Sequence, residues 1–114
     1  MALNHVSLTV RDRRRSAAFY AEHFGLTRTV HDDEARLILG ADDGSVLALV
    51  TGEPPDLPDG NHFGFQLAAG AAVRAARERF RVAGLEETDW QDDGTFVRVQ
   101  VADPDGYQVE LYAF

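Results

Sequence analysis

The chain has 114 residues, of which 45% are hydrophobic and 26% charged, and it contains no cysteine. This composition is typical of one compact domain with a modest core, and it excludes disulfides, thiolate metal ligands and a cysteine nucleophile. No run of 18 apolar residues and no basic stretch followed by an apolar segment occurs, so we expect neither a membrane span nor a signal peptide, and a cytoplasmic location. The formal net charge of −8 argues against nucleic acids and anionic membranes as partners, because both require a basic surface.

Hydrophobic periodicity predicts a βαβββ order in the first half of the chain. The expected elements are a strand over 3–10, a helix over 13–24 and strands over 26–31, 35–39 and 45–50. Asp12 is placed to accept hydrogen bonds at the helix start, and Gly25 is placed to adopt a left-handed conformation at its end. The first half therefore forms one supersecondary module.

The second half predicts the same order again. The expected elements are a strand over 62–67, a helix over 71–83 and strands over 86–90, 95–102 and 107–114. Residues 51–60 carry three of the four prolines and are expected to form a polar linker. We expect a single domain over 1–114, with module one at 1–52, the linker at 51–60 and module two at 61–114.

Each half opens on an Asn-His pair that starts an alternating strand, at Asn4-His5 and again at Asn61-His62. In both strands the apolar residues share one face and the histidine lies on the other face. If the two halves pack symmetrically, equivalent positions come together and the two imidazoles converge. Such a convergence predicts a metal site that includes His5 and His62.

A carboxylate completes this set near the end of the chain. Glu110 lies between two apolar residues, and alternation along its strand puts it on the polar face. A charged carboxylate in a half-buried strand needs a cation or a proton. Aligning Gly44 with Gly106 puts Ala48 at the position equivalent to Glu110, so the first module offers no fourth ligand there.

The predicted metal ligands are thus His5, His62 and Glu110. Three protein ligands leave positions open for water, substrate or oxygen, as a catalytic ion requires. Two histidines and one carboxylate suit Fe(II), Mn(II), Zn(II) or Ni(II), so the ligand set does not fix the ion. The alternatives are that each histidine is a partly exposed polar residue, or that the site is vestigial.

Further polar-face residues follow from the strand over 96–102. Alternation there puts Arg98 on the polar face, where its guanidinium can hold an anionic substrate group. The alternative is a salt-bridged arginine without a role in binding. Trp90, Phe96 and Tyr112 can supply an aromatic wall, although aromatic residues in strands are more often core.

The arrangement of these motifs resembles a known superfamily. The segments of this chain that carry the resemblance are Asn4-His5, Ala18-Phe19-Tyr20, Phe24-Gly25-Leu26, His62 and Asp103-Pro104-Asp105-Gly106-Tyr107-Gln108-Val109-Glu110-Leu111. They are similar to the vicinal oxygen chelate superfamily, which includes glyoxalase I, extradiol dioxygenases, fosfomycin-resistance enzymes and bleomycin-binding resistance proteins. The resemblance implies an α+β fold in which two βαβββ modules form a cup-shaped mixed sheet. It also implies a homodimer and places His5, His62 and Glu110 on the family's ligand positions.

Departures from the subfamily patterns narrow the function. Ala48 removes the fourth ligand of glyoxalase I, and the chain has no lysine to hold a phosphonate as the fosfomycin-resistance enzymes do. Extradiol dioxygenases add a histidine and a tyrosine for acid-base work, for which His31, His23 and Tyr112 are candidates.

We therefore expect a divalent-metal-dependent enzyme acting on a small molecule. Dioxygenase-like chemistry is the first expectation and fosfomycin-type transfer the second, with Tyr112 and Arg98 as catalytic candidates. The alternative is a non-catalytic, dimeric, bleomycin-type drug-binding protein, and a purely structural role is the third possibility.

Overall fold

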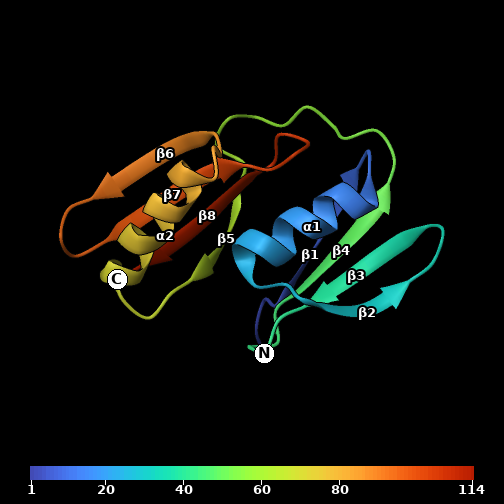
Figure 1. Ribbon diagram of the computed structural model, residues 1–114, viewed down its shortest axis with the longest axis horizontal. Coiled ribbons are helices and arrows are strands. Elements are labelled where there is room, and N and C mark those ends of the chain that lie inside the picture. Colours follow the sequence, from blue (N-terminus) through green and yellow to red (C-terminus); the bar gives the residue numbers. More distant parts are fainter. The chain divides into compact units, whose positions relative to one another are not determined.

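The computed structural model describes all 114 residues and divides into two compact units, Met1–Asp56 and Leu57–Phe114. The boundary lies inside the proline-rich segment that was predicted to be a linker. Each unit consists of a four-stranded mixed sheet with one helix packed on it (Figure 1). The chain thus has the α+β class and the two βαβββ modules predicted from its sequence.

The first unit contains β1 (His5–Val10), α1 (Arg13–Phe24), β2 (Arg28–Asp32), β3 (Arg36–Gly40) and β4 (Val46–Thr51). Its sheet has the order β1-β4-β3-β2, with β1 parallel to β4 and the other pairs antiparallel. Its core lies between α1 and the sheet. The largest fully buried side chains in this unit are Tyr20, Leu26, Leu37, Leu47, Leu49 and Val10.

The second unit contains β5 (Phe63–Gln66), α2 (Gly70–Val82), β6 (Glu87–Asp92), β7 (Val97–Ala102) and β8 (Gln108–Ala113). Its sheet order, β5-β8-β7-β6, is the first sheet's order repeated. Helix α2 packs mainly on β7 and β8. The buried residues of this core include Val73, Ala76, Phe80, Val97, Val99, Val101, Val109 and Leu111.

The duplication extends to the strand register. Ser7 pairs with Ala48 in the first sheet, and Gly64 pairs with Glu110 at the equivalent point of the second. Each module also has one register irregularity. It lies at Thr29/His31 between β2 and β3 in the first module, and at Glu87/Asp89 between β6 and β7 in the second. The predicted equivalence of Ala48 and Glu110 is therefore confirmed by backbone pairing.

Helix α1 begins and ends at the predicted residues. The Asp12 carboxylate accepts hydrogen bonds from the backbone amides of Arg14 and Arg15 at 3.0 and 3.1 Å, which satisfies two N–H groups that no earlier turn can reach. Gly25 ends the helix at φ 72°, a left-handed conformation that is costly for residues with a side chain. The amide of Leu26 then donates to the Tyr20 carbonyl at 3.2 Å, so Leu26 belongs to the helix cap and not to the following strand as predicted.

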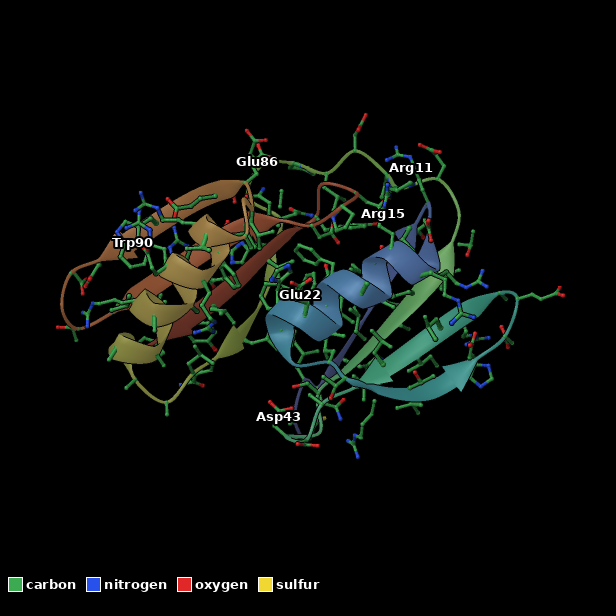
Figure 2. All side chains as sticks on the ribbon, in the orientation of Figure 1. Arg11, Arg15, Glu22, Asp43, Glu86 and Trp90 are labelled. Carbon is green, nitrogen blue, oxygen red and sulfur yellow. The ribbon has the colours of Figure 1, made fainter.

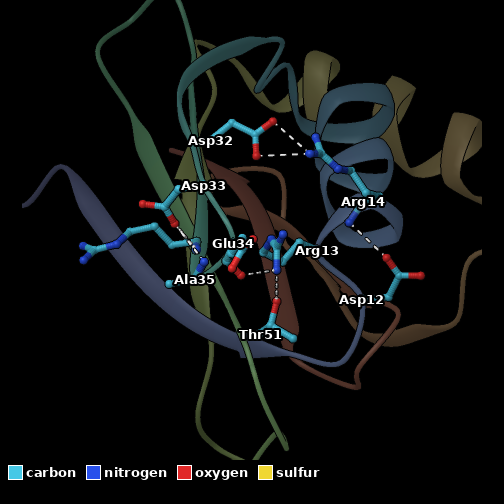
Figure 3. Close-up of polar contacts among 9 residues, drawn as sticks. Asp12, Arg13, Arg14, Asp32, Asp33, Glu34, Ala35 and Thr51 are labelled. Atoms are coloured by element: carbon cyan, nitrogen blue, oxygen red, sulfur yellow. Dashed lines mark hydrogen bonds and ion pairs between the residues drawn. The ribbon is translucent and has the colours of Figure 1, made fainter.

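Two strands also begin later than predicted, for one physical reason. Asp33 accepts hydrogen bonds from the amides of Ala35 and Arg36 at 2.8 and 2.9 Å, and Asp93 accepts from Thr95 and Phe96 at 2.9 and 2.6 Å (Figure 3 shows the Asp33–Ala35 contact). These Asx turns hold the backbone out of the ladder for one or two residues. Consequently β3 begins at Arg36 and β7 at Val97.

Arginines at the start of α1 attach the helix to its own sheet (Figure 3). Arg13 Nη1 donates to the Glu34 carbonyl at 2.7 Å and to Thr51 Oγ1 at 2.5 Å. Arg14 Nη2 contacts both carboxylate oxygens of Asp32, at 3.1 and 2.9 Å. Arg13 and Arg14 therefore have structural partners within their own unit.

An ion pair between α2 and β6 supports a prediction about acid stability. Arg74 forms two hydrogen bonds to Asp92, at 2.8 and 3.0 Å, and holds the pKa of the Asp92 carboxyl at about 2. Because this pKa is lower in the folded state than in the unfolded state, the pair stabilises the fold above pH 3.8 and loses its effect as the pH falls through about 2. We expect a carboxyl titration by NMR to place Asp92 near 2 and, in Arg74→Gln, closer to 3.8.

The Gly94 amide also lowers the pKa of Asp92, so the return in Arg74→Gln is partial. Arg79→Gln on the same helix is the matched control and leaves the Asp92 midpoint unchanged. An Asp92 titration midpoint near 3.8 in the unsubstituted protein would contradict the effect of Arg74 on this pKa.

Candidate metal centre

The polar face of the second sheet is opposite the face that α2 covers. Backbone pairing joins Gly64 to Glu110, Glu110 to Gln100 and Gln100 to Asp89, so these four residues form one row across all four strands. Residues paired directly in a sheet share a face. Glu110 and Gln100 are 7% and 5% exposed, so the centre of this row is a buried pair of polar side chains.

His62 lies immediately before β5, at one end of this polar face. Its Nδ1 donates to the Gly60 carbonyl at 3.0 Å, so the proton of the neutral ring is assigned to Nδ1 and the lone pair to Nε2. Nε2 faces Glu110 Oε2 at 3.7 Å. A lone pair and a carboxylate oxygen that approach each other need a proton or a metal ion between them.

The two oxygens of the Glu110 carboxylate have different neighbours. Oε1 accepts a hydrogen bond from Arg98 Nη1 at 3.3 Å, whereas Oε2 faces His62. Arg98 Nη2 in turn pairs with Asp89 on the neighbouring strand. Asp89 and Arg98 thus orient Glu110 while leaving its Oε2 available.

These atoms fit a divalent ion. Two ligands at 2.0 to 2.2 Å from one ion are about 2.8 to 3.1 Å apart at an octahedral angle and about 3.3 to 3.6 Å apart at a tetrahedral angle. The observed 3.7 Å between His62 Nε2 and Glu110 Oε2 is within a few tenths of an ångström of the tetrahedral range. A ligand histidine that donates its other ring N–H to a backbone carbonyl is the usual arrangement around such ions.

Gly64 provides the space for this carboxylate. A Cβ at this position would lie 2.9 Å from both the Cβ and the carbonyl oxygen of Glu110, and 3.3 Å from its Oε2. Its equivalent in the first sheet is Ser7, which stands beside Ala48 and meets no such side chain. Glycine at residue 64 therefore leaves the room that the Glu110 carboxylate occupies.

His5 begins β1 in the first unit. Its Nδ1 contacts Asn4 Oδ1 at 3.3 Å, so its proton is assigned to Nδ1 and its Nε2 is left with the lone pair, as in His62. Within each unit taken by itself, no group of three or more potential ligands is present. The predicted set draws on both units, with two of its three members in the second.

The other histidines have local partners. His31 Nε2 contacts Asp33 Oδ2 at 2.6 Å, and together with two backbone amides it lowers the pKa of the exposed Asp33 carboxyl to about 2. His23 is only 13% exposed and its ring packs edge-on against Phe19 at 5.0 Å. Both residues lie in the first unit, whereas the polar row that contains Glu110 belongs to the second.

Tyr112 pairs with Arg98 across β7 and β8. This pair is two residues along each strand from Glu110 and Gln100, and therefore lies on the same face of the sheet. Its ring contacts Phe96 and Phe114, at centroid distances of 6.3 and 6.0 Å. This aromatic cluster borders the carboxylate site. Trp90 does not belong to it, because Trp90 pairs with Val99 on the helix-covered face and lies under Arg77 at 4.1 Å (labelled in Figure 2).

A pocket of about 660 Å³ lies over this face of the second unit and opens to solvent. It is polar and includes His62, Arg98, Asp89 and Gln100 among its lining residues. Glu87 also lines it, and two hydrogen bonds from Arg77 at 2.7 and 3.1 Å lower the pKa of the Glu87 carboxyl. The pocket is large enough for a small-molecule ligand.

Comparison with known proteins assigns the class. The family model described as Glyoxalase/Bleomycin resistance protein/Dioxygenase superfamily matches residues 2–111, so the chain belongs to this superfamily. A search of curated proteins found no match. Neither helix is long and apolar enough to cross a membrane.

Solved structures share the fold. The fosfomycin resistance protein FosX of Listeria monocytogenes has a TM-score of 0.85 at 22% identity, covering 100% of this chain and 93% of its own. Lactoylglutathione lyase of Agrobacterium tumefaciens has a TM-score of 0.80 at 21% identity, covering 98% and 92%. A possible glyoxalase of Bacillus cereus has a TM-score of 0.81 at 25% identity, covering 97% of each chain. FosX has been crystallised with Mn(II) and with a dihydroxypropylphosphonic acid.

Three residues of the site were not singled out from the sequence: Gly64, Gln100 and Asp89. Alternation put Gln100 on the same face as Arg98, but its pairing with Glu110 depends on strand order and register. The register irregularity at Glu87/Asp89 decides which β6 residue faces Arg98. For Gly64, the duplicated phrase offered a signal, because glycine stands where the first module has Ser7.

Substituting Gly64 tests whether this position serves the carboxylate. We expect Gly64→Ala to displace Glu110, to lower the free energy of unfolding by about 1 to 3 kcal/mol and to weaken metal binding. Thermal unfolding and metal titration measure the two effects. Gly60→Ala is the matched control, because a Cβ there meets nothing within 4 Å. Equal behaviour of the two variants would contradict the assignment.

Proposed function

We propose that this chain is a divalent-metal-dependent enzyme acting on a small molecule that chelates the ion through neighbouring oxygens. The observation that carries the proposal is the approach of His62 Nε2 and Glu110 Oε2 to 3.7 Å, with the histidine proton held on the other nitrogen. His5, which has the same tautomer, is the proposed third ligand. The bound ion would act as a Lewis acid on the substrate oxygens and, if it is Fe(II), as the centre that binds dioxygen.

Each residue around the ligands has a proposed task. Arg98 and Asp89 hold the orientation of Glu110, so Arg98 is a positioning residue as well as a lining residue of the pocket. Tyr112 is the proposed proton donor or acceptor, because its hydroxyl makes no hydrogen bond within the chain and its ring lies beside Arg98. The aromatic cluster of Phe96, Tyr112 and Phe114 would exclude water from one side of the substrate.

Dioxygenase-like chemistry is the favoured reaction class. Two histidines and one carboxylate with open positions form the ligand set of non-haem Fe(II) oxygenases. Fosfomycin-type transfer is less well supported, because the chain has no lysine and its only arginine at this site is paired with two carboxylates. The non-catalytic alternative is a drug-binding protein, which would not need the ligands.

Metal content tests the proposal. We expect protein purified without chelator or a nickel column to contain about one ion per chain by mass spectrometry, and His5→Ala, His62→Ala and Glu110→Gln to lose most of it. His31→Ala is the matched control and should retain the ion, because His31 pairs with Asp33 in the first unit. A chain without metal that also takes up none of Fe(II), Mn(II), Zn(II) or Ni(II) would contradict the proposal and leave the drug-binding and the purely structural alternatives.

We further propose a homodimer. Large apolar side chains are strongly exposed in the single chain, among them Leu3 at 97%, Val82 at 82% and Phe114 at 78%. Mixing His5→Ala with His62→Ala chains extends the metal experiment to the dimer. After free exchange of subunits, half of the dimers are mixed, so recovery of about a quarter of an ion per chain would place His5 of one subunit with His62 of its partner, and no recovery would place both in one chain. A monomer in analytical ultracentrifugation would contradict the dimer.

A further inference from the structure

The pocket over the second sheet contains more negative than positive charge. Four carboxylates and one guanidinium are among the residues that line it. The complete lining is Asp59, Gly60, His62, Glu86, Glu87, Thr88, Asp89, Arg98, Gln100, Ala102, Gly106 and Gln108. Glu110 is not a lining residue, but it adds a further carboxylate next to two that are, because it contacts Arg98 and pairs with Gln100.

Two of these carboxylates have no cationic partner. Glu87 is neutralised by Arg77, whereas Asp89 and Glu110 share the single charge of Arg98. Asp59 and Glu86 form no ion pair in the structure, and both are exposed at the pocket rim (Figure 2 labels Glu86 next to the start of β6). Their charges are therefore available to a ligand.

Arg98 is not available to an anion. Its Nη1 donates to Glu110, its Nη2 pairs with Asp89, and its remaining Nε is buried without a hydrogen-bond partner. An anionic substrate group would have to compete with two carboxylates that are already in place. No lysine and no other arginine lines the pocket to receive such an anionic group.

Gln100 is an independent sign that a ligand belongs in this pocket. Gln100 is only 5% exposed, and it lines the pocket next to Glu110, with which it pairs. Its side-chain amide makes no hydrogen bond within the chain. Its amide atoms are not among the fully buried polar atoms that lack a partner, so they reach the open space of the pocket and their hydrogen bonds are open to a molecule there. A polar ligand over the row that contains Glu110 would satisfy them.

We infer that this pocket takes a small molecule that carries a positive charge beside its vicinal oxygens, and that it disfavours anionic analogues. The oxygens face His62 and Glu110, Gln100 hydrogen-bonds the polar portion between, and the cationic group faces Asp59 and Glu86. This inference rests on the proposed function for the chelating end only. A divalent ion offsets two of the excess negative charges and a chelating hydroxyl that loses its proton restores one, so the filled site stays negative and a cationic group offsets part of that remaining charge.

Three catechols that differ in charge test the inference: dopamine as the cation, 4-ethylcatechol as the neutral molecule and 3,4-dihydroxyphenylacetate as the anion. Calorimetric titration of the full chain loaded with Zn(II), without oxygen, measures their affinities. We expect dopamine to bind on the order of tenfold more tightly than the anion at low salt, with 4-ethylcatechol between them. At 0.5 M salt the difference should fall to about twofold, because the rim carboxylates are exposed.

Substitutions assign the preference to named residues. The double variant Asp59→Asn with Glu86→Gln should abolish most of the difference between cation and anion, while leaving 4-ethylcatechol unchanged. Glu78→Gln removes one carboxylate charge from α2, on the opposite face of the sheet, and should leave the difference intact, whereas the single variant Glu86→Gln should reduce it. Gln100→Leu should weaken all three ligands by about tenfold without changing metal content.

The inference is overturned if the anion binds as tightly as dopamine, or if the double variant keeps the preference. It also fails if none of the three catechols binds to a chain that holds its ion, although the proposed metal site would then stand. If the chain holds no ion, the proposed function fails. The charge preference is then read from the shifts of the Gln100 side-chain amide in NMR spectra of the metal-free chain with dopamine or 3,4-dihydroxyphenylacetate.

Discussion

The site depends on one buried carboxylate, Glu110, in the last strand of the second sheet. At 7% exposure it requires positive charge close by. Arg98 supplies charge at one carboxylate oxygen, and the other oxygen faces His62, where the proposed ion would supply the rest. Gly64 has no side chain because a Cβ there would strike this carboxylate. Asp89 is required because it holds the second half of the Arg98 guanidinium.

Duplication explains how such a site can arise on a small domain. The two sheets have the same strand order and register, and their modules have the same left-handed glycines after the helix, at Gly25 and Gly84. The modules differ where function is proposed. Ala48 and Ser7 occupy the positions of Glu110 and Gly64, so the first module keeps the histidine position and has lost the carboxylate. A repeated scaffold thus carries an asymmetric site.

Much of this structure follows from local sequence signals. Asp12, Gly25 and the periodicity of α1 predict that helix to the residue, because capping and left-handed turns are decided within a few residues of chain. Strand starts were predicted less well, since the side chains of Asp33 and Asp93 take backbone amides that propensity assigns to the ladder. Trp90 was placed in the aromatic wall, but the register irregularity before it turns it to the helix side. The pairing of Asp89 with Arg98 depends on that same irregularity, and no pattern within one strand indicates it.

The most direct test of this account is a long-range ¹H–¹⁵N spectrum of the histidine rings before and after addition of Zn(II). We predict that His62 carries its proton on Nδ1 in the neutral metal-free chain, as its 3.0 Å bond to the Gly60 carbonyl requires, and that the Nε2 resonance shifts on metal binding. The Nδ1 resonance should change little. A proton on Nε2, or a His62 spectrum that does not respond to any divalent ion, would contradict the claim that His62 and Glu110 converge on a metal.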